Sequence, residues 1–430
     1  MDYGLIGARL GYSYSKIIHE QVCDYTYDLH PLPTEEEARA FFAAKEYRAI
    51  NVTIPYKKVV MEYCDEIAPA ALAIGAVNTV VNKNGKLYGY NTDYAGFSYL
   101  CEAHGIAFAG KTVLILGTGG TRNTTYAVAR DGGAANIFVA SRTPKPEQGE
   151  IDYQAALTCG AQIIINTTPA GTYPNTDTCA IDIKAMQGVE AVVDAVYNPF
   201  QTELVLRATE MGIPKEKAVT GLEMLVAQAV YAAEHFLSKP FPNAEAEIAK
   251  TTAQLKAKLS NIALIGMPSC GKSSLGKALA TDLGKTFVDL DEEIEKAAGK
   301  PIPQIFAEDG EAAFRAIEHE QIARFAKENR QILSCGGGAV LDDSNMRALR
   351  QNGMIVYIDR PLEQLATGGY RPLSTSAEAL QKMYAIRAPL YTAAADMVFH
   401  NSGLHFAVSR NKLLCEVKLH LQQGCPATAP

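Results

Sequence analysis

The chain has 430 residues, enough for about three domains of ordinary size, and 48% of them are hydrophobic against 20% charged. Its formal net charge of −7 offers no basic excess for nucleic acid or an anionic membrane surface, and no stretch is long and apolar enough to suggest a membrane span. The 9 cysteines are odd in number and lack C-x-x-C spacing, which favours reduced thiols and a cytoplasmic protein over a disulfide scaffold or a zinc site.

The first hundred residues alternate short β-rich runs with helical patterns, which predicts an α/β domain over residues 1–100. Helices are expected at residues 35–45 and 55–64, and the second opens at Pro55, a residue suited to a helix start. The strands expected here are residues 4–7, 49–54, 77–81 and, after the hairpin signal Asn84-Gly85, residues 86–90.

Polar side chains of this first domain fall where the expected strands end. Ser13 and Ser15 would share a face if the chain is extended there, as would Asn51 and Thr53. Lys57 lies one helical turn beyond Thr53 if the helix forms as expected. Each of these residues alone is most simply a cap or a solvated surface residue, but together they indicate a binding site.

A dinucleotide-binding domain is expected over residues 101–220. The apolar run 111–116 predicts a strand, and the G-x-G-G pattern from Gly117 to Gly120 is typical of the turn that holds a pyrophosphate at a helix N-terminus. After the next expected strand, Arg142 stands where an acidic residue would bind the ribose of NAD, and its guanidinium suits the 2′-phosphate of NADP(H). The alternative is an ordinary loop arginine in solvent.

Helical patterns then close the first half of the chain. A helix beginning near Gly221 carries Gln228 on its early turns, and a proline-rich break at residues 240–242 precedes another helix that ends at Leu259. The helices within residues 221–258 are therefore expected to complete the first domain.

The stretch from Gly266 to Ser273 reads G-M-P-S-C-G-K-S and lies between a strand-like run and a helical one. Glycines let backbone N–H groups approach phosphate oxygens, Lys272 can reach the outer phosphates, and Ser273 can ligate Mg²⁺. An isolated match could be a chance glycine-rich turn, but its strand and helix context favours a nucleoside triphosphate site in a third domain, residues 260–430.

The first half resembles shikimate dehydrogenases over residues 1–258, because eight motifs occur in the order of that family. The resemblance implies an α/β substrate domain with a Rossmann-like NADP domain, and NADPH-dependent reduction of 3-dehydroshikimate to shikimate. The motifs are G-L-I-G at Gly4, S-Y-S at Ser13, N-V-T-I-P-Y-K ending at Lys57, G-A-V-N-T at Gly75, Y-N-T-D ending at Asp93, G-T-G-G-T at Gly117, N-T-T-P-x-G at Asn166 and G-L-E-M-L-V-A-Q ending at Gln228.

The resemblance also assigns roles to residues of this chain. Lys57 is expected to supply the proton that a reduced ketone needs, and Asp93 to orient the lysine and the substrate hydroxyls. The positions matching the family's other substrate contacts are Ser13, Ser15, Thr53, Asn78, Tyr197 and Gln228. The positions expected to bind NADP(H) are Gly117, Thr118, Gly119, Gly120, Thr121, Ser141, Arg142, Thr143, Lys145 and Gly221. The chain departs from the family at Ser141, where an Asn is usual, and in the short segment 144–160.

Residues 260–425 resemble shikimate kinases. Beyond the phosphate loop, the motifs that carry this resemblance are D-L-D ending at Asp291, F-R ending at Arg315, C-G-G-G ending at Gly338, Y-R-P-L around Arg371 and R-A-P-L-Y starting at Arg387. The resemblance implies a P-loop α/β domain of the nucleoside-monophosphate-kinase type that transfers the γ-phosphoryl group of ATP to the 3-hydroxyl of shikimate.

In this kinase interpretation, Asp291 holds and deprotonates the attacking hydroxyl, while Lys272 and the lid residue Arg371 stabilise charge on the transferring phosphoryl group. One strand from Phe287 is expected to present both aspartates on one face, and the helix of Arg315 is expected to end at Glu318. Shikimate would be bound by Arg315, Gly337 and Arg387, Mg²⁺ by Ser273 and Asp289, and ATP by Ser269, Cys270, Gly271, Ser273 and Ser274.

The sequence thus predicts a bifunctional, cytoplasmic enzyme of aromatic biosynthesis that uses NADP(H), ATP and Mg²⁺ on small-molecule substrates, with neither nucleic acid nor membrane as partner. Two alternatives remain open on sequence alone. One is a sensor that keeps the binding folds without catalysis, and the other is a quinate/shikimate dehydrogenase fused to a weakened kinase. The oligomeric state is not indicated.

Overall fold

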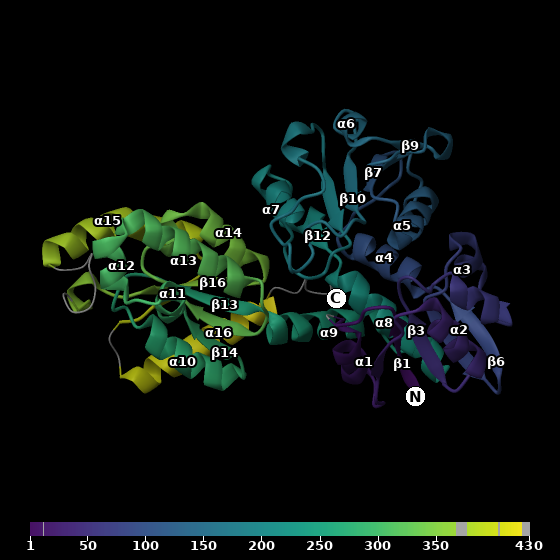
Figure 1. Cartoon of the computed structure of the whole chain (residues 1–430), viewed down its shortest axis with the longest axis horizontal. Helices are drawn as coiled ribbons and strands as arrows, with labels where there is room; N and C mark the ends of the chain where they lie inside the picture. Colours follow the sequence, from purple (N-terminus) through teal and green to yellow (C-terminus); the bar gives the residue numbers. More distant parts are fainter. Residues whose placement is uncertain (12, 367–375, 403–404, 424–430) are drawn as a thin grey trace. The chain divides into compact units, whose positions relative to one another are not determined.

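The computed structural model describes residues 1–11, 13–366, 376–402 and 405–423. The chain divides into two compact units (Figure 1). Both units are of the α/β class that the sequence predicted. Among the described residues, unit 1 comprises Met1–Asn198 and Thr202–Leu255, and unit 2 comprises Pro199–Gln201 and the residues from Lys256 to Gln423.

The first lobe of unit 1 is built on a 6-stranded sheet in the order β2-β1-β3-β5-β6-β4. Strands β1, β2 and β3 are parallel, whereas β5 and β6 form the expected antiparallel hairpin. Its elements are β1 (Tyr3–Gly7), α1 (Ser15–Val22), β2 (Asp28–Pro31), α2 (Glu35–Ala44), β3 (Ala49–Val52), the 3-10 helix η1 (Val59–Tyr63), β4 (Glu66–Ile67), α3 (Pro69–Ile74), β5 (Thr79–Lys83) and β6 (Lys86–Tyr90).

The helix predicted at residues 55–64 is wrong in its first half, where the chain makes turns before η1. The Tyr56 N–H donates to the Thr53 carbonyl at 3.0 Å, and the Lys57 carbonyl accepts from the Val77 N–H at 2.9 Å. Because the Lys57 carbonyl accepts from Val77, just before β5, it does not accept the helical hydrogen bond from the Met61 N–H. The Met61 N–H donates to the Lys58 carbonyl instead. Lys57 therefore stands on a turn anchored to the sheet.

The second lobe of unit 1 has a fully parallel 6-stranded sheet in the order β12-β11-β10-β7-β8-β9. The strands that follow β7 directly in the sequence, β8 and β9, lie on one side of it, and β10, β11 and β12 lie on the other side. In doubly wound sheets ligands bind in the crevice at such a change of direction, and the chain that leaves β7 enters this crevice. Its elements are β7 (Thr112–Leu116), α5 (Gly120–Asp131), β8 (Asn136–Ala140), η2 (Pro146–Gln148), β9 (Glu150–Ile151), α6 (Tyr153–Ala156), β10 (Ile163–Asn166), η3 (Ile183–Ala185), β11 (Ala191–Asp194), α7 (Glu203–Glu210), η4 (Lys215–Lys217) and β12 (Ala218–Thr220).

Helices α4 (Thr92–Ala103) and α8 (Leu222–Leu237) pack against each other between the two lobes of unit 1 (Figure 1). A side chain at Gly96 would meet the Met224 carbonyl oxygen at 2.8 Å, so the glycine permits the close approach of the helices. The Asn91 side chain accepts hydrogen bonds from the N–H groups of Asp93 and Tyr94 and so fixes where α4 begins.

Unit 2 wraps helices around a fully parallel 5-stranded sheet in the order β14-β15-β13-β16-β17. The central strand β13 is buried along its whole length, which its apolar sequence predicted. The elements from the last helix of the first half onward are α9 (Ala244–Leu259), β13 (Asn261–Ile265), α10 (Lys272–Leu283), β14 (Thr286–Asp289), α11 (Leu290–Ala298), α12 (Ile302–Glu308), α13 (Gly310–Ala326), β15 (Gln331–Ser334), η5 (Ala339–Leu341), α14 (Asp343–Gln351), β16 (Gly353–Asp359), η6 (Leu362–Gln364), α15 (Ala377–Ala394), β17 (Met397–His400) and α16 (Phe406–Gln423).

Two local expectations in unit 2 are wrong. Strand β14 ends at Asp289, whose side chain accepts a hydrogen bond from the Asp291 N–H at 3.2 Å and thereby caps α11. Asp291 is consequently in the first turn of a helix and not on the strand. Helix α13 does not end at Glu318 but runs on to Ala326.

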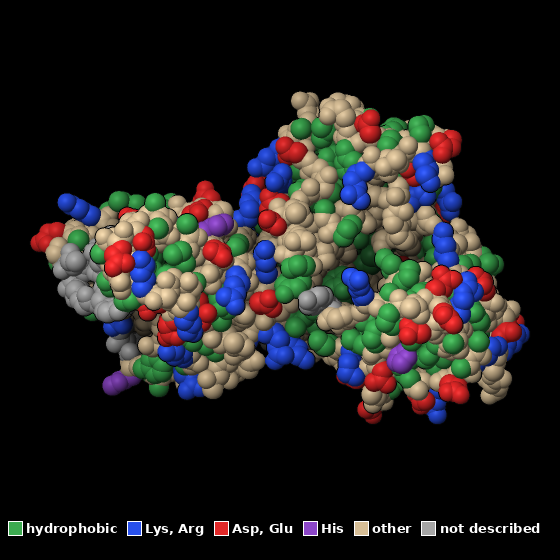
Figure 2. Space-filling model, in the orientation of Figure 1, with side chains coloured by type: hydrophobic (Ala, Val, Ile, Leu, Met, Phe, Trp, Pro, Cys, Tyr) green, Lys and Arg blue, Asp and Glu red, His purple; other side chains and the backbone are tan. Residues whose placement is uncertain are grey.

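The surface and the helices of the described residues show two further general features. On the face drawn in Figure 2, basic and acidic side chains are intermixed over both units. None of the helices within the described ranges has the length and apolar character needed to cross a membrane.

Two candidate active sites

A cavity of about 600 Å³ in unit 1 gathers the residues that the sequence analysis marked for substrate binding. These residues come from the loop after β1 and the start of α1, the turn after β3, the position just before β5, the first turn of α4, the loop after β11 and the first half of α8. Figure 2 shows a hollow between the two lobes of this unit. The predicted residues that line the cavity are Ser13, Ser15, Thr53, Lys57, Asn78, Asp93, Thr121, Tyr197, Gly221 and Gln228.

The ion pair in this cavity joins Lys57 to Asp93. Lys57 Nζ lies 2.6 Å from Asp93 Oδ2, and the two side chains keep only 19% and 14% of their surface exposed. Lys57 is carried by the turn after β3, and Asp93 by the capped first turn of α4. A shielded ammonium held at this distance can donate a proton to a bound oxygen while the carboxylate keeps it oriented.

A buried hydrogen-bond network stands behind the pair. Asn78 Oδ1 accepts from the Thr92 N–H at 2.8 Å and from the Thr79 hydroxyl at 2.9 Å. Asn51 donates to that threonine at 3.0 Å and accepts from the Tyr27 hydroxyl at 2.7 Å. Much of the hydrogen-bonding capacity of Asn78 is therefore used to orient the start of α4, which carries Asp93.

Asn51 lines the cavity, and the sequence analysis places it with Thr53 among the polar residues that together indicate a binding site, although it gives Asn51 no role of its own. Arg9 lines the cavity as well, and it follows β1 in a loop whose motif the sequence analysis read only for its serines.

The glycine-rich turn of unit 1 follows β7 as predicted and leads into α5. Gly117 adopts φ 94°, and a side chain there would meet Thr168 Cγ2 at 2.7 Å, so the turn needs glycine. Thr118, Gly119 and Gly120 are exposed, and Thr121 lines the cavity that holds Lys57. The helix N-terminus thus opens onto the same space as the ion pair.

The residues predicted to recognise the 2′-phosphate follow β8. Arg142, Thr143 and Lys145 are exposed, and the Thr143 N–H donates to the Ser141 hydroxyl at 3.3 Å. The segment after them forms only η2, β9 and α6, in keeping with the shortness noted in the sequence. Gly221 packs its Cα against the Ala195 backbone, where a Cβ would overlap the carbonyl group.

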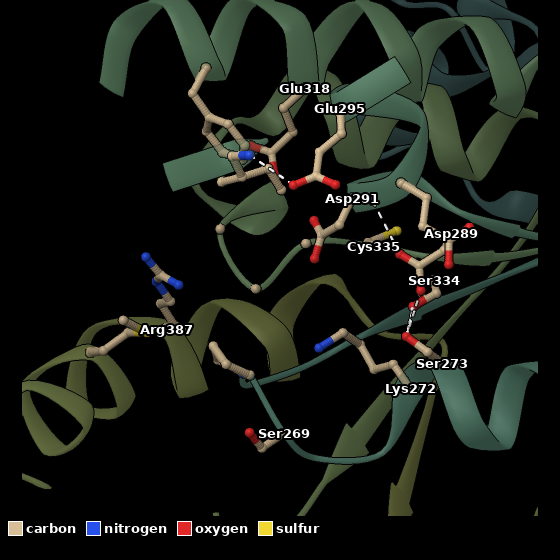
Figure 3. A pocket seen from close by; sticks show the side chains of 18 of the residues that line it. Ser269, Lys272, Ser273, Asp289, Asp291, Glu295, Glu318, Ser334, Cys335 and Arg387 are labelled. Atoms are coloured by element: carbon tan, nitrogen blue, oxygen red, sulfur yellow. Dashed lines mark hydrogen bonds between the residues drawn. The ribbon is translucent and has the colours of Figure 1, made fainter. Parts of the chain in front are cut away.

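Unit 2 has its own cavity of about 600 Å³, at the predicted phosphate loop. Figure 3 shows Lys272, Asp291 and Arg387 pointing into this cavity from three different elements. The predicted residues that line it are Ser269, Gly271, Lys272, Ser273, Ser274, Asp289, Asp291, Arg315, Gly337 and Arg387.

The phosphate loop is held in a strained shape by its neighbours. Gly271 adopts φ 103° and Ser269 φ 66°, so the loop leaves β13 and enters α10 through left-handed positions. Lys272 is 8% exposed, and its Nζ donates to the carbonyls of Gly266 at 2.9 Å and Met267 at 3.0 Å. Cys270 is fully buried, and its carbonyl accepts from Asn401 Nδ2 at 2.9 Å.

Oxygen ligands converge beside this loop. The Ser273 hydroxyl donates to Asp289 Oδ2 at 2.6 Å and lies 3.1 Å from the Ser334 hydroxyl. Hydroxyl and carboxylate oxygens suit Mg²⁺, which typically binds few protein groups and keeps water and phosphate oxygens as its other ligands. No group of three or more His, Cys, Asp or Glu side chains in the described parts of the chain is arranged to hold a metal ion.

Two arginines and a buried carboxylate form the other end of the unit 2 cavity. Arg315 Nη1 donates to Glu318 Oε2 at 2.6 Å, and burial raises the pKa of the Glu318 carboxyl while Arg315 opposes the rise. Arg387 is 7% exposed. The glycines before η5 let the chain pass close to these groups, because a Cβ at Gly336 would meet Glu318 Oε1 at 2.8 Å.

The backbone of Gly337 is fixed from the opposite side. The Tyr391 hydroxyl donates to the Gly337 carbonyl, and a Cβ at this glycine would meet Pro268 Cδ at 3.0 Å. The chain can therefore pass Pro268 this closely only if position 337 has no side chain. The predicted lid residue Arg371 lies outside the described residues.

Comparisons with known proteins identify both halves. Residues 5–80 match the family model of the shikimate dehydrogenase substrate binding domain, and residues 268–416 match that of shikimate kinase. A shikimate dehydrogenase (NADP(+)) of Clostridium perfringens is 37% identical over 255 residues, which cover 54% of this chain and 90% of that protein.

Solved structures agree with the dehydrogenase matches of the first half. A chorismate mutase/shikimate 5-dehydrogenase fusion protein from Clostridium acetobutylicum shares 32% identity at a TM-score of 0.55, covering 60% of this chain and 97% of that one. Shikimate 5-dehydrogenase from Thermus thermophilus, in complex with NADP(H) and shikimate, shares 25% identity at a TM-score of 0.51, covering 58% and 99%. The chain belongs to the shikimate dehydrogenase family through its first half and joins that enzyme to a shikimate kinase domain in one polypeptide.

Proposed function

We propose that the chain catalyses two consecutive reactions, the NADPH-dependent reduction of 3-dehydroshikimate to shikimate and the ATP-dependent phosphorylation of shikimate at its 3-hydroxyl. The observation that carries the proposal is the 2.6 Å pair of Lys57 and Asp93 in a cavity lined by the predicted substrate contacts. The kinase step is supported by the phosphate loop and by the carboxylates and arginines that share its cavity.

In the first reaction, bound NADPH supplies the hydride. Lys57 donates a proton to the carbonyl oxygen of the substrate as negative charge develops there, and the hydroxyl group of shikimate results. Asp93 keeps the ammonium in place and offers its other oxygen to a ring hydroxyl. The lobe that holds α5 and β8 would bind the cofactor, with Gly119 and Gly120 at the pyrophosphate and the exposed Arg142 and Lys145 at the 2′-phosphate.

In the second reaction, Asp291 accepts the proton of the 3-hydroxyl as that oxygen attacks the γ-phosphorus of ATP, and the bond from the γ-phosphorus to the β–γ bridging oxygen breaks so that ADP leaves. Arg315 and Arg387 bind the shikimate carboxylate from two helices. When ATP binds, the Lys272 ammonium exchanges its hydrogen bonds to two loop carbonyls for hydrogen bonds to phosphate oxygens. Its charge there stabilises the transferring phosphoryl group.

Mg²⁺ fits the oxygen ligands of Ser273 and Asp289, which would hold it. When bound, it neutralises charge on the β- and γ-phosphates. The role that the resemblance gives to Arg371, stabilising charge on the transferring phosphoryl group, stays a prediction, because this residue lies outside the described residues.

A coupled assay on the purified full-length chain tests the proposal. The reaction contains 3-dehydroshikimate, NADPH, ATP and Mg²⁺, and both NADPH consumption and shikimate 3-phosphate formation are followed. We expect both signals, with phosphate ester appearing after a lag while shikimate accumulates. NADPH loss without the ester would remove the kinase half of the proposal, and loss of neither substrate would favour a binding protein over an enzyme.

A quinate dehydrogenase that uses NAD is the main competing activity of the first half. The exposed Arg142 and Lys145 after β8 favour a 2′-phosphorylated cofactor, because two basic side chains there match an additional phosphate. Steady-state kinetics with shikimate and quinate, each with NADP⁺ and NAD⁺, separate the two. A higher kcat/KM for quinate with NAD⁺ would overturn the assignment.

A further inference from the structure

Arg9 lines the cavity of unit 1 although no motif marked it as a site residue. It lies two residues beyond β1 and is exposed, which places its side chain at the rim of the cavity. Within the described residues its guanidinium has no hydrogen-bond or ion-pair partner. An arginine without a partner beside a binding cavity keeps all of its donors available for a ligand.

The charges of the cavity lining make this arginine significant. The described side chains that line the cavity and carry charge are Arg9, Lys57 and Asp93. Lys57 and Asp93 neutralise each other at 2.6 Å. Arg9 therefore gives the lining a net charge of about +1, and an anionic group on the substrate gains a Coulombic attraction that a neutral group lacks.

Hydroxyl donors lie on the same loop as Arg9. The Ser13 N–H donates to the Leu10 carbonyl at 3.1 Å, so the chain turns back on itself directly after Arg9. The Ser13 and Ser15 hydroxyls are 3.1 Å apart, and both residues line the cavity. A guanidinium and two neighbouring hydroxyls together make a set of donors that fits the two oxygens of a carboxylate.

We propose that Arg9 binds the carboxylate of the ring substrate of unit 1 and sets its preference for carboxylate-bearing substrates. This inference rests on the proposed function, since it takes shikimate and 3-dehydroshikimate as the ligands. Arg9 acts on substrate binding and not on the proton transfer, which belongs to Lys57. Its removal is therefore expected to raise KM and to leave kcat nearly unchanged.

The test compares shikimate with its methyl ester, which keeps the ring and its hydroxyls but carries no charge. Oxidation of each by NADP⁺ is measured in the absence of ATP for the full-length wild type and for Arg9→Ala and Arg9→Lys. Arg48→Ala serves as the matched control, because Arg48 is an exposed arginine of the same lobe, paired with Asp2 at 3.4 Å. Dissociation constants of both compounds are measured by calorimetry in parallel.

For shikimate, Arg9→Ala is expected to raise KM and Kd about tenfold or more and to change kcat less than threefold. For the methyl ester the same variant should change Kd less than threefold, and Arg9→Lys should recover part of the shikimate affinity. Arg48→Ala should match the wild type with both compounds.

An equal effect of Arg9→Ala on shikimate and on the ester would overturn the inference, because it would show a general disturbance of the loop. An unchanged KM for shikimate, or an increase confined to the KM of NADP⁺, would overturn it too. If the wild type oxidises neither compound, the proposed function fails. The calorimetric difference between shikimate and its ester then still decides whether Arg9 recognises the carboxylate.

Discussion

Lys57 Nζ lies 2.6 Å from Asp93 Oδ2, although the two residues are carried by different elements of unit 1. The carbonyl of Lys57 is anchored to β5 through Val77, and Asp93 is fixed in the capped first turn of α4. The pair is therefore preorganised by backbone contacts and does not depend on substrate to form. Such preorganisation is what a proton donor needs if it is to act without a costly rearrangement during the reaction.

Replacing Lys57 should stop dehydrogenase turnover without preventing substrate binding. In Lys57→Met the proton donor is lost while most of the side-chain volume remains, so kcat should fall by about 10² to 10⁴. The Kd of shikimate, measured by calorimetry, should stay within a few-fold of the wild type. Lys58→Met, at the exposed neighbour, is the control and should keep full activity. A Lys57→Met enzyme with a kcat near that of the wild type would exclude Lys57 from the chemistry.

Replacing Lys272 should affect only the kinase reaction. The Lys272 ammonium lies inside the phosphate loop, where it donates to two carbonyls of the same loop. Lys272→Met should lower the rate of shikimate 3-phosphate formation at least about a hundredfold, since the charge on the transferring group loses a preorganised partner. NADPH oxidation by the same preparation should be unchanged. Lys277→Met, at an exposed position of α10, controls for the loss of a lysine from that helix; parallel losses in both lysine variants would refute a specific role.

Magnesium should be required by one activity alone. The Ser273 hydroxyl donates a hydrogen bond to Asp289 Oδ2 at 2.6 Å, and the oxygens of the two side chains are ligands that suit this ion. Chelation by EDTA should therefore abolish phosphorylation and leave dehydrogenase turnover intact. Asp289→Asn should raise the Mg²⁺ concentration needed for half-maximal kinase rate by about tenfold or more, because a carboxylate ligand becomes a neutral amide. An unaltered Mg²⁺ dependence in this variant would show that Asp289 is not a ligand.

The sequence predicted the type and order of most elements because the apolar strands and the glycine-rich turns are local signals. Strand β13 with the loop from Gly266, and β7 with the turn from Gly117, are read from consecutive residues. The candidate site residues followed from motifs. The structure gathers the predicted substrate contacts of unit 1 and most of the predicted phosphate-loop residues in two cavities, whereas Ser141, Arg142, Thr143 and Lys145 line neither cavity.

What could not be predicted depends on contacts between distant segments. The turn at Lys57 forms because its carbonyl is used by Val77, a residue twenty positions later. Asp291 lies on a helix because the Asp289 side chain caps the start of that helix. This cap is not visible in the strand-like pattern of the sequence. Arg9 has no distinguishing neighbour in the sequence, and its place in the cavity emerges only when β1 and its loop are assembled with α4 and α8.

A buried histidine should make the stability of unit 1 depend on acid. His19 is fully buried, its ring stacks on that of Tyr27 at 4.0 Å between centroids, and its Nδ1 lies 2.8 Å from the Tyr25 hydroxyl. Burial lowers the pKa of His19 from 6.5 to about 3. Between those values the unfolded chain binds more protons than the folded one, so the free energy of unfolding must fall as pH falls from about 6.5 towards 3.

The expected loss from this one group is roughly 2 to 3 kcal/mol between pH 7 and pH 4.5. Hydrogen exchange of peptides from β1 and α8 measures this loss of stability within unit 1 alone. An unfolding curve of the whole chain would combine the unfolding of both units and is therefore less suitable. His19→Phe keeps a ring for the stack but cannot take up a proton, so its exchange protection should decline less over this pH range. His30→Gln, at an exposed position of β2, is the control and should keep the wild-type slope. If His19→Phe and the wild type show equal pH slopes, removing the imidazole has not changed the acid sensitivity. Other groups would then govern it, and the prediction for His19 would be wrong.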